Sequence, residues 1–165
     1  MSKWARRAKN LGEGAQASFA QKSLEETVKD AGGSARDIEF VMETSGRRLP
    51  APLLLDATGL SEIERFYFDV VADGGRLIEG GILQFERLMA LFLGQTLVSA
   101  GKAEWALYEG ASAVLFPVLP RLLDSREYLD VFWLCGEIGK SSRAGGTGGG
   151  FLRTWFEKPE LVAVR

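Results

Sequence analysis

The string of residues 132–141 looks most like a chemical site, because an apolar segment leads into Gly139-Lys140-Ser141. A phosphate-binding loop ends in Gly-Lys-Ser and wraps backbone amides around phosphate groups, but it needs a glycine five positions before the Gly-Lys pair. Leu134 stands at that position, so the spacing does not fit a nucleotide hydrolase. The acid that could bind magnesium, Asp56, lies upstream of the string, whereas such hydrolases place it downstream. We therefore expect Lys140 to be a helix-end lysine that contacts no phosphate.

A glycine run at residues 145–150 could also cradle a phosphate through its backbone amides. The glycine fingerprint of dinucleotide-binding domains follows a strand and opens a helix. This run instead follows a predicted helix, so we interpret residues 141–150 as a flexible loop. A small ligand-binding domain or enzyme that uses this loop stays open as an alternative.

The chain has no histidine, which removes the commonest general base and the commonest metal ligand near neutral pH. Its single cysteine, Cys135, lies in an apolar run and is predicted to be buried and unreactive. Glu86 beside Arg87 is interpreted as the polar edge of a helix. The remaining carboxylate pairs have capping or surface explanations: Glu25 with Glu26, and Glu62 with Glu64. The sequence therefore predicts a protein that is not an enzyme and that uses no cofactor and no metal.

A length of 165 residues fits a single domain over residues 1–165, in which residues 1–33 form a weakly committed N-terminal segment. The formal charge of −2 provides no basic field for nucleic acid or for an anionic membrane. No segment approaches the roughly 20 apolar residues of a membrane span, and no apolar signal segment follows the first residues. We expect a cytoplasmic protein that binds neither nucleic acid nor membrane.

The element that must organise the domain is a central helix that begins at Ile82. Its apolar residues recur in steps of three and four and widen into a stripe almost all the way round, which is typical of a helix buried on several sides. Gly101 is expected to end it in the left-handed conformation. Residues 103–108 then read as a strand.

Shorter patterns predict the other elements. Capping-box spacing predicts helices over 24–29, from Ser61 to about Ala72, and from Asp124 onward. Alternation predicts a strand over 36–42, and the turn at Glu109-Gly110 predicts a hairpin whose second strand is 111–116, with Pro117 and Pro120 limiting the pairing. The fold class is α+β: three main helices packed on a small, mostly antiparallel sheet with a central hairpin. Trp105 and Phe92 are expected to be nearly fully buried.

Residues 53–140 resemble a loose group of small bacterial domains found among the immunity proteins of polymorphic and type VI secreted toxins. The residues that carry this resemblance are Asp56, Leu60, Ser61, Gly94, Leu97, Val98, Gly101, Glu104, Trp105 and Pro117. The resemblance implies a non-enzymatic protein that blocks a cognate toxin by contact, with a homodimer left open. An adaptor or assembly protein is the first alternative.

Protein interfaces favour aromatic side chains together with arginine. The expected contact residues therefore flank the glycine-rich loop: Arg143, Arg153, Trp155 and Glu157. A second expected group lies at the hairpin tip, at Tyr108 and Glu109. Trp155 and Phe156 could instead tie the tail to the core.

Overall fold

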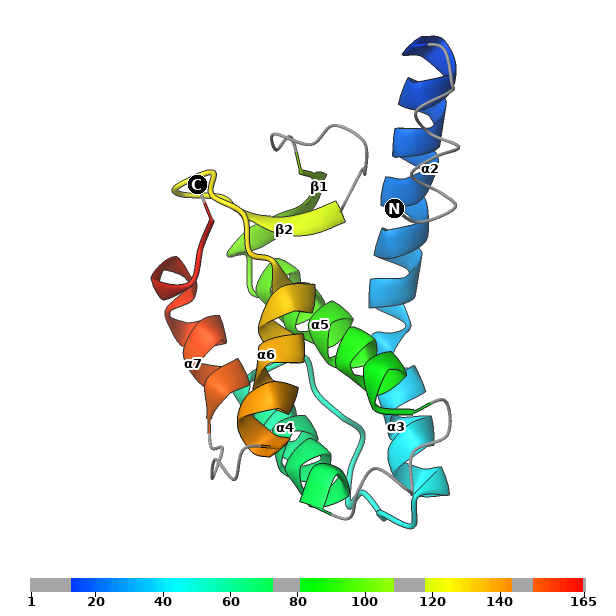
Figure 1. Ribbon diagram of the computed structural model, residues 1–165, viewed down its shortest axis with the longest axis vertical. Helices are drawn as coiled ribbons and strands as arrows, with labels where there is room; N and C mark the ends of the chain where they lie inside the picture. Colours follow the sequence, from blue (N-terminus) through cyan, green and yellow to red (C-terminus); the bar gives the residue numbers. More distant parts are fainter. Residues whose placement is uncertain (1–12, 73–80, 109–117, 144–149, 165) are drawn as a thin grey trace.

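The computed structural model describes residues 13–72, 81–108, 118–143 and 150–164 (Figure 1). These residues form six α-helices and a two-stranded antiparallel sheet, which confirms the α+β class. The elements in chain order are α2 (Glu13–Gly32), α3 (Ser34–Thr44), α4 (Ala57–Ala72), α5 (Gly81–Ser99), β1 (Ala103–Leu107), β2 (Val118–Leu122), α6 (Val131–Arg143), α7 (Phe151–Glu157) and the short 3-10 helix η1 (Pro159–Leu161). No helix within these residues is both long and apolar enough to cross a membrane.

The centre of the molecule is α5, as the sequence predicts. Its buried residues fall on nearly every side of the helix: Phe85, Glu86, Leu88, Met89, Ala90, Leu91, Phe92, Leu93, Gly94, Thr96 and Leu97. Helices α2, α3, α4, α6 and α7 and both strands contact it, so the helices pack on a helix rather than on a sheet. Gly101 follows with a φ of 72°, which confirms the expected helix end.

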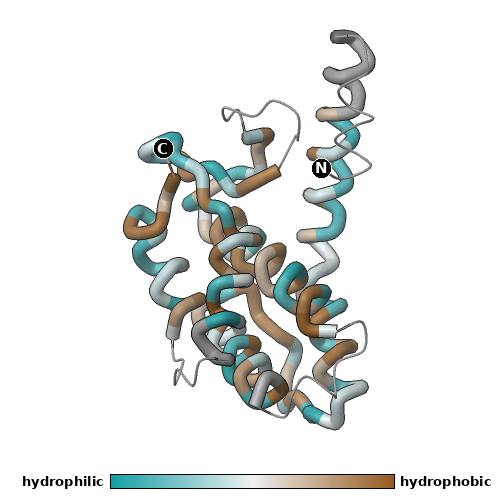
Figure 2. Tube along the Cα trace, in the orientation of Figure 1, coloured by the Kyte–Doolittle hydropathy of each residue, from teal (hydrophilic) through white to brown (hydrophobic). Residues whose placement is uncertain are grey.

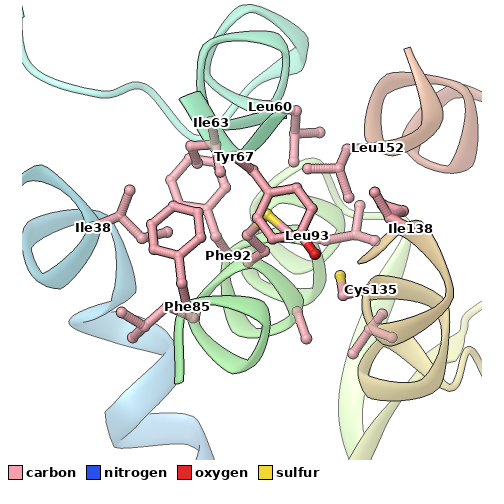
Figure 3. Close-up of a cluster of buried hydrophobic side chains, with 14 of the residues drawn as sticks. Ile38, Leu60, Ile63, Tyr67, Phe85, Phe92, Leu93, Cys135, Ile138 and Leu152 are labelled. Carbon is pink, nitrogen blue, oxygen red and sulfur yellow. The ribbon is translucent and has the colours of Figure 1, made fainter. Parts of the chain in front are cut away.

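The hydrophobic core lies where α3, α4, α5, α6 and α7 meet (Figure 3). Phe85 of α5 stacks on Tyr67 of α4 at 6.1 Å and meets Phe66 edge-on at 5.4 Å. Leu152 of α7 and Ile138 of α6 close the opposite side. Figure 2 shows apolar residues gathered in this centre, whereas much of α2 is hydrophilic.

The strand predicted over residues 36–42 is wrong, because this segment belongs to α3. Ile38, Val41 and Met42 are buried. Val41 and Met42 follow Ile38 by three and four residues, so all three lie on one helical face. Phe40, which the alternating pattern would put beside Ile38 and Met42, instead points to solvent. The helix predicted over 24–29 is part of the longer α2, which ends at Gly32.

The strand predicted from Ala103 is confirmed, but its partner is β2 at Val118–Leu122, and the predicted second strand at 111–116 lies outside the described residues. Pro120 sits inside β2 opposite Trp105 and does not stop the pairing. Its carbonyl accepts the N–H of Leu129 at 2.9 Å, so it faces away from β1. The missing N–H of Pro120 lies on that same side, where the ladder with β1 does not need it.

Two helix starts differ from the capping-box prediction. Helix α4 begins at Ala57 rather than at Ser61, and Asp56 accepts the N–H of Gly59 at 2.9 Å. Helix α6 begins at Val131 rather than after Asp124. Asp130 caps it by accepting the N–H of Trp133 at 3.1 Å, while the preceding turn holds Arg126 at a left-handed φ of 64°.

Trp105 is half-buried, so its expected near-complete burial is wrong, whereas Phe92 is fully buried as predicted. The Trp105 ring lies against Gly94 of α5, and its indole N–H donates to Gln95 Oε1 at 3.1 Å. Gln95, the hydrogen-bond partner of the indole, is also half-buried.

Replacing Gly94 with alanine should destabilise the fold by about 1–3 kcal/mol, the usual effect of overpacking a core. The added methyl group would overlap the Trp105 ring and the Pro120 side chain. Gly136→Ala on α6 is the matched control, because no atom lies near the added methyl group and alanine favours a helix. Urea unfolding of both variants checks this; equal midpoints would contradict the packing of β1 on α5.

Candidate functional site

Four polar side chains are buried in the described part of the chain: Ser34, Glu64, Glu86 and Thr96. The hydroxyls of Ser34 and Thr96 donate to carbonyls of Ala31 and Phe92, one turn earlier. The two glutamates are the interior groups with chemistry to offer, so their partners decide what this interior can do.

Glu86 is buried in the core with 7% of its surface exposed, which corrects its assignment to a polar helix edge. The Tyr67 hydroxyl donates to Glu86 Oε1 at 2.7 Å. The backbone of Gly139 on α6 packs directly against both groups, and any larger residue there would overlap Glu86 Oε1 and the Tyr67 hydroxyl. Arg87, the next residue, does face solvent and pairs with Asp30 of α2 at 3.2 Å. Glu86 therefore joins α4, α5 and α6.

Glu64 is also buried, with 4% of its surface exposed, which corrects its assignment to the surface. Its carboxylate accepts the N–H of Gly150 and the N–H of Leu152, the latter at 2.9 Å. Gly150 has a φ of 79°, a conformation that glycine adopts readily. The carboxylate thus fixes the first turn of α7 onto α4.

Cys135 is fully buried, as predicted. Burial raises the pKa of its thiol, and the nearby carboxylates of Glu86 and Glu64 raise it further. The thiol is therefore not ionised near neutral pH and is a poor nucleophile. Among the described residues, no group of three or more acidic, cysteine or histidine side chains is placed to hold a metal ion.

Glu64→Ala should lower the free energy of unfolding by about 2–4 kcal/mol, since each buried N–H left without an acceptor costs about 1–3 kcal/mol. Proteolysis should then cleave the segment around α7 first. Glu62→Ala, at a half-buried position of the same helix where the carboxylate pairs with the exposed Arg65, is the control and should change stability by no more than about 0.5 kcal/mol. Equal loss in both variants would argue against a specific role for the Glu64 carboxylate.

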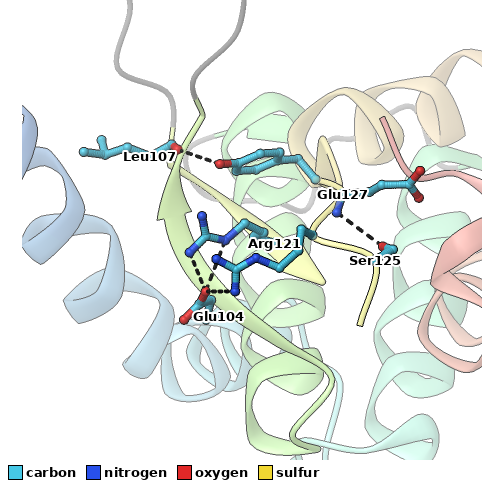
Figure 4. Close-up of polar contacts among 7 residues, drawn as sticks. Glu104, Leu107, Arg121, Ser125 and Glu127 are labelled. Atoms are coloured by element: carbon cyan, nitrogen blue, oxygen red, sulfur yellow. Dashed lines mark hydrogen bonds and ion pairs between the residues drawn. The ribbon is translucent and has the colours of Figure 1, made fainter. Parts of the chain in front are cut away.

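A surface ion-pair group lies on the β1–β2 pair (Figure 4). Glu104 accepts from Arg121 Nε at 3.1 Å and Nη2 at 2.5 Å, and Arg126 Nη1 lies 3.9 Å away. The hydrogen bonds from Arg121 lower the pKa of Glu104, and the charges of Arg121 and Arg126 act in the same direction. This group links β1 to β2 and reaches Arg126 in the turn before α6.

The lowered pKa of Glu104 predicts a pH dependence of stability. The folded state binds its proton more weakly than the unfolded state, so the stabilisation is present above the ordinary glutamate pKa and is lost as pH falls through the folded value. The native chain should therefore be more stable than Glu104→Gln at pH 7, and this difference in stability should disappear on acidification. Thermal melts at low salt measure it, and added salt should narrow the difference. A difference that widens in acid would contradict this.

The expected contact residues fall into two groups that the fold keeps apart. At the end of the β1–β2 pair, Tyr108 meets the Tyr128 ring edge-on at 5.0 Å, and the Tyr128 hydroxyl donates to the Leu107 carbonyl at 3.1 Å. Glu109 lies outside the described residues, and Arg143 is the last residue of α6. The other expected residues, Arg153, Trp155 and Glu157, belong to α7. Figure 1 shows that α7 lies well away from the end of β1.

On α7, Arg153 and Glu157 form an exposed ion pair at 2.9 Å. Trp155 is half-buried against Phe151 and the core, and the Phe156 ring lies 4.3 Å from Lys102 Nζ. The tail therefore packs on the body, as the apolar pattern after the glycine run predicts. Trp155 contributes to that packing, while Arg153 and Glu157 are available to a partner.

On the described parts of the α-helices, three large apolar side chains have more than half of their surface exposed and were not among the expected contact residues: Phe40 on α3 at 60%, Leu83 on α5 at 78% and Trp133 on α6 at 61%. The helical spacing of Val131, Leu134 and Cys135 is the signal that could have found Trp133, because it leaves that residue on the opposite face. A hollow of ≈ 560 Å³ beside the α2–α3 junction is lined by Gly32, Gly33, Ala35, Arg36, Asp37 and Glu39.

Comparison with family models, with curated proteins and with solved structures finds no match for this chain. The resemblance to immunity domains therefore stays a prediction. The described residues combine a hydrophobic interior, in which the buried carboxylates are hydrogen-bonded, with a surface that carries large exposed apolar side chains.

Proposed function

We propose that this chain is a non-enzymatic protein-binding domain, and specifically an immunity protein that neutralises a cognate bacterial toxin by direct contact. The observation that supports protein binding is the exposure of Phe40, Leu83 and Trp133 on well-packed helices. The sequence resemblance supports the narrower class of immunity protein.

The interior carboxylates have structural roles in this proposal. Glu64 accepts two backbone N–H groups of the α7 turn, and Glu86 accepts the Tyr67 hydroxyl. A general acid or base must reach the proton that it transfers, within hydrogen-bond distance of the substrate. Both carboxylates are enclosed by packed helices, so they stabilise the arrangement of α4, α5, α6 and α7 instead.

The exposed side chains stand on rigid supports. Phe40 lies opposite Ile38 and Val41, which are in the core, and Trp133 lies opposite Leu134 and Cys135. Large apolar side chains held in place lose little conformational freedom when a partner binds, so they contribute strongly to affinity. Single exposed apolar residues are common on monomers, but an exposed tryptophan of this degree fits a contact surface.

The contact surface that we propose first is the outer face of α7. Arg153 and Glu157 are exposed there, and their ion pair at 2.9 Å contributes little to folding because it lies in water. Their charges can therefore be used by a partner without loss of stability. The anchored first turn at Gly150 keeps this face in one orientation.

The test is co-expression with the toxin encoded beside this chain's gene, followed by a binding measurement. Alanine at both Arg153 and Glu157 should weaken the complex about tenfold or more and leave the melting temperature unchanged. Alanine at both Asp30 and Arg87, an exposed ion pair on the other side of the molecule, is the matched control.

A loss seen only with the control pair would move the interface to the α2–α5 side. A chain that binds and protects against no toxin would reject the immunity proposal. Tight binding to a partner that is not a toxin would instead support an adaptor.

A further inference from the structure

One face of α6 combines an aromatic ring with acids. Its inner face carries Val131, Leu134, Cys135 and Ile138, all buried in the body. Trp133 points the other way with 61% of its surface exposed. Glu137 lies four residues after it on the same helix, a spacing that puts Cβ atoms about 5–6 Å apart on one helical face, and Asp130 caps the helix three residues before it. Along the helix, Trp133 thus lies between two carboxylate residues.

Both carboxylates are held by contacts that leave them accessible. Asp130 uses Oδ1 to accept the N–H of Trp133, which fixes it at the start of the helix. Glu137 Oε1 pairs with Lys140 Nζ at 2.7 Å, and that lysine side chain is 71% exposed. An exposed pair at this spacing contributes little free energy, so an incoming cation can replace Lys140 at low cost.

The surface beside the indole has room for a ligand. Gly136 lies three residues after Trp133, and a side chain built there would meet no atom within 4 Å. The surface of α6 is therefore open at Gly136, one turn after Trp133. A flat group that approaches the indole has space at this position.

We propose that this face of α6 is a binding site for an arginine side chain of the partner protein. A cation is attracted to the face of an indole, and the two carboxylates add charge complementarity on either side. Arginine fits better than lysine, because its planar guanidinium can stack on a ring and donate to a carboxylate at once. The proposal deepens the proposed function: it names a residue type that the toxin presents and places a second contact on α6, besides α7.

The first arm of the test uses N-acetyl-arginine amide as the probe, with N-acetyl-citrulline amide as a neutral analogue of the same shape. The chain has four tryptophans, so indole N–H signals in an NMR spectrum can be followed one by one, with Trp133 identified by its loss in Trp133→Phe. The arginine probe should shift the Trp133 signal saturably and leave Trp155 unchanged, and the citrulline probe should shift neither.

Asp130→Asn, which keeps an acceptor for the helix cap, and Glu137→Gln should each weaken probe binding about two- to fivefold, the size of one exposed charge contact. Equal shifts with both probes, or affinities unchanged in both variants, would overturn the proposal. Circular dichroism of each variant confirms that α6 is still folded.

The second arm measures the complex with the co-expressed toxin. Trp133→Ala should weaken it about tenfold or more, while Leu54→Ala, a control in the segment before α4 whose exposed fraction of 61% equals that of Trp133, should have little effect. A toxin complex that is insensitive to Trp133→Ala would overturn this inference and leave the proposed function standing. A selective arginine site on a chain that binds no toxin would support the site and reject the proposed function.

Discussion

Burial of α5 on almost every side is the constraint on which the rest of the structure depends. A single helix with apolar residues around its whole circumference must be covered by neighbours in all directions. Helices α2, α3, α4, α6 and α7 and the β1–β2 pair provide that cover. Gly94 allows the closest approach, because its missing side chain leaves the space that the Trp105 ring occupies.

The polar groups buried beside α5 determine how its neighbours are oriented. A carboxylate in a protein interior is tolerated only when hydrogen bonds replace its water. Glu86 meets this need through Tyr67 and brings α4 against α5, while Glu64 meets it through the backbone of α7. Apolar packing alone would allow these helices to slide, whereas directional acceptors fix one arrangement. Burial raises the pKa of the Cys135 thiol, and the charges of these two carboxylates raise it further.

Much of the central architecture could be predicted from the sequence, because local periodicity reports burial directly. The stripe beginning at Ile82 predicts α5, and the segment that follows the helix end at Gly101 is correctly predicted as the strand β1. Helix α3 was missed because Ile38, Phe40 and Met42 fit a period of two, and only the burial of Val41 distinguishes a helix. The start of α6 was misplaced because Asp124 and Asp130 are both plausible caps, and the left-handed Arg126 between them leaves no trace in composition.

The candidate site was harder to predict, for a different reason. Glu64 has its hydrogen-bond partners 86 and 88 residues away, so no local pattern distinguishes it from Glu62, which pairs with Arg65 on its own helix. The glycines 136 and 139 look equivalent in the sequence, yet one faces open space and the other faces Glu86 and Tyr67. Trp133 differs, because its position in the helical period relative to Val131 and Leu134 predicts that it faces away from the core.

The long helix α2 has a consequence for how the molecule opens. Among its described side chains only Ala20 and Ala31 are buried, both small, and its N-terminal half projects beyond the other described elements (Figure 1). Two alanines remove little apolar surface from water, so residues 20–32 of α2 are attached more weakly than α5. Native-state amide exchange should therefore be graded: this part of α2 should open at a lower free energy than α5, whose amides should exchange only when the whole domain unfolds.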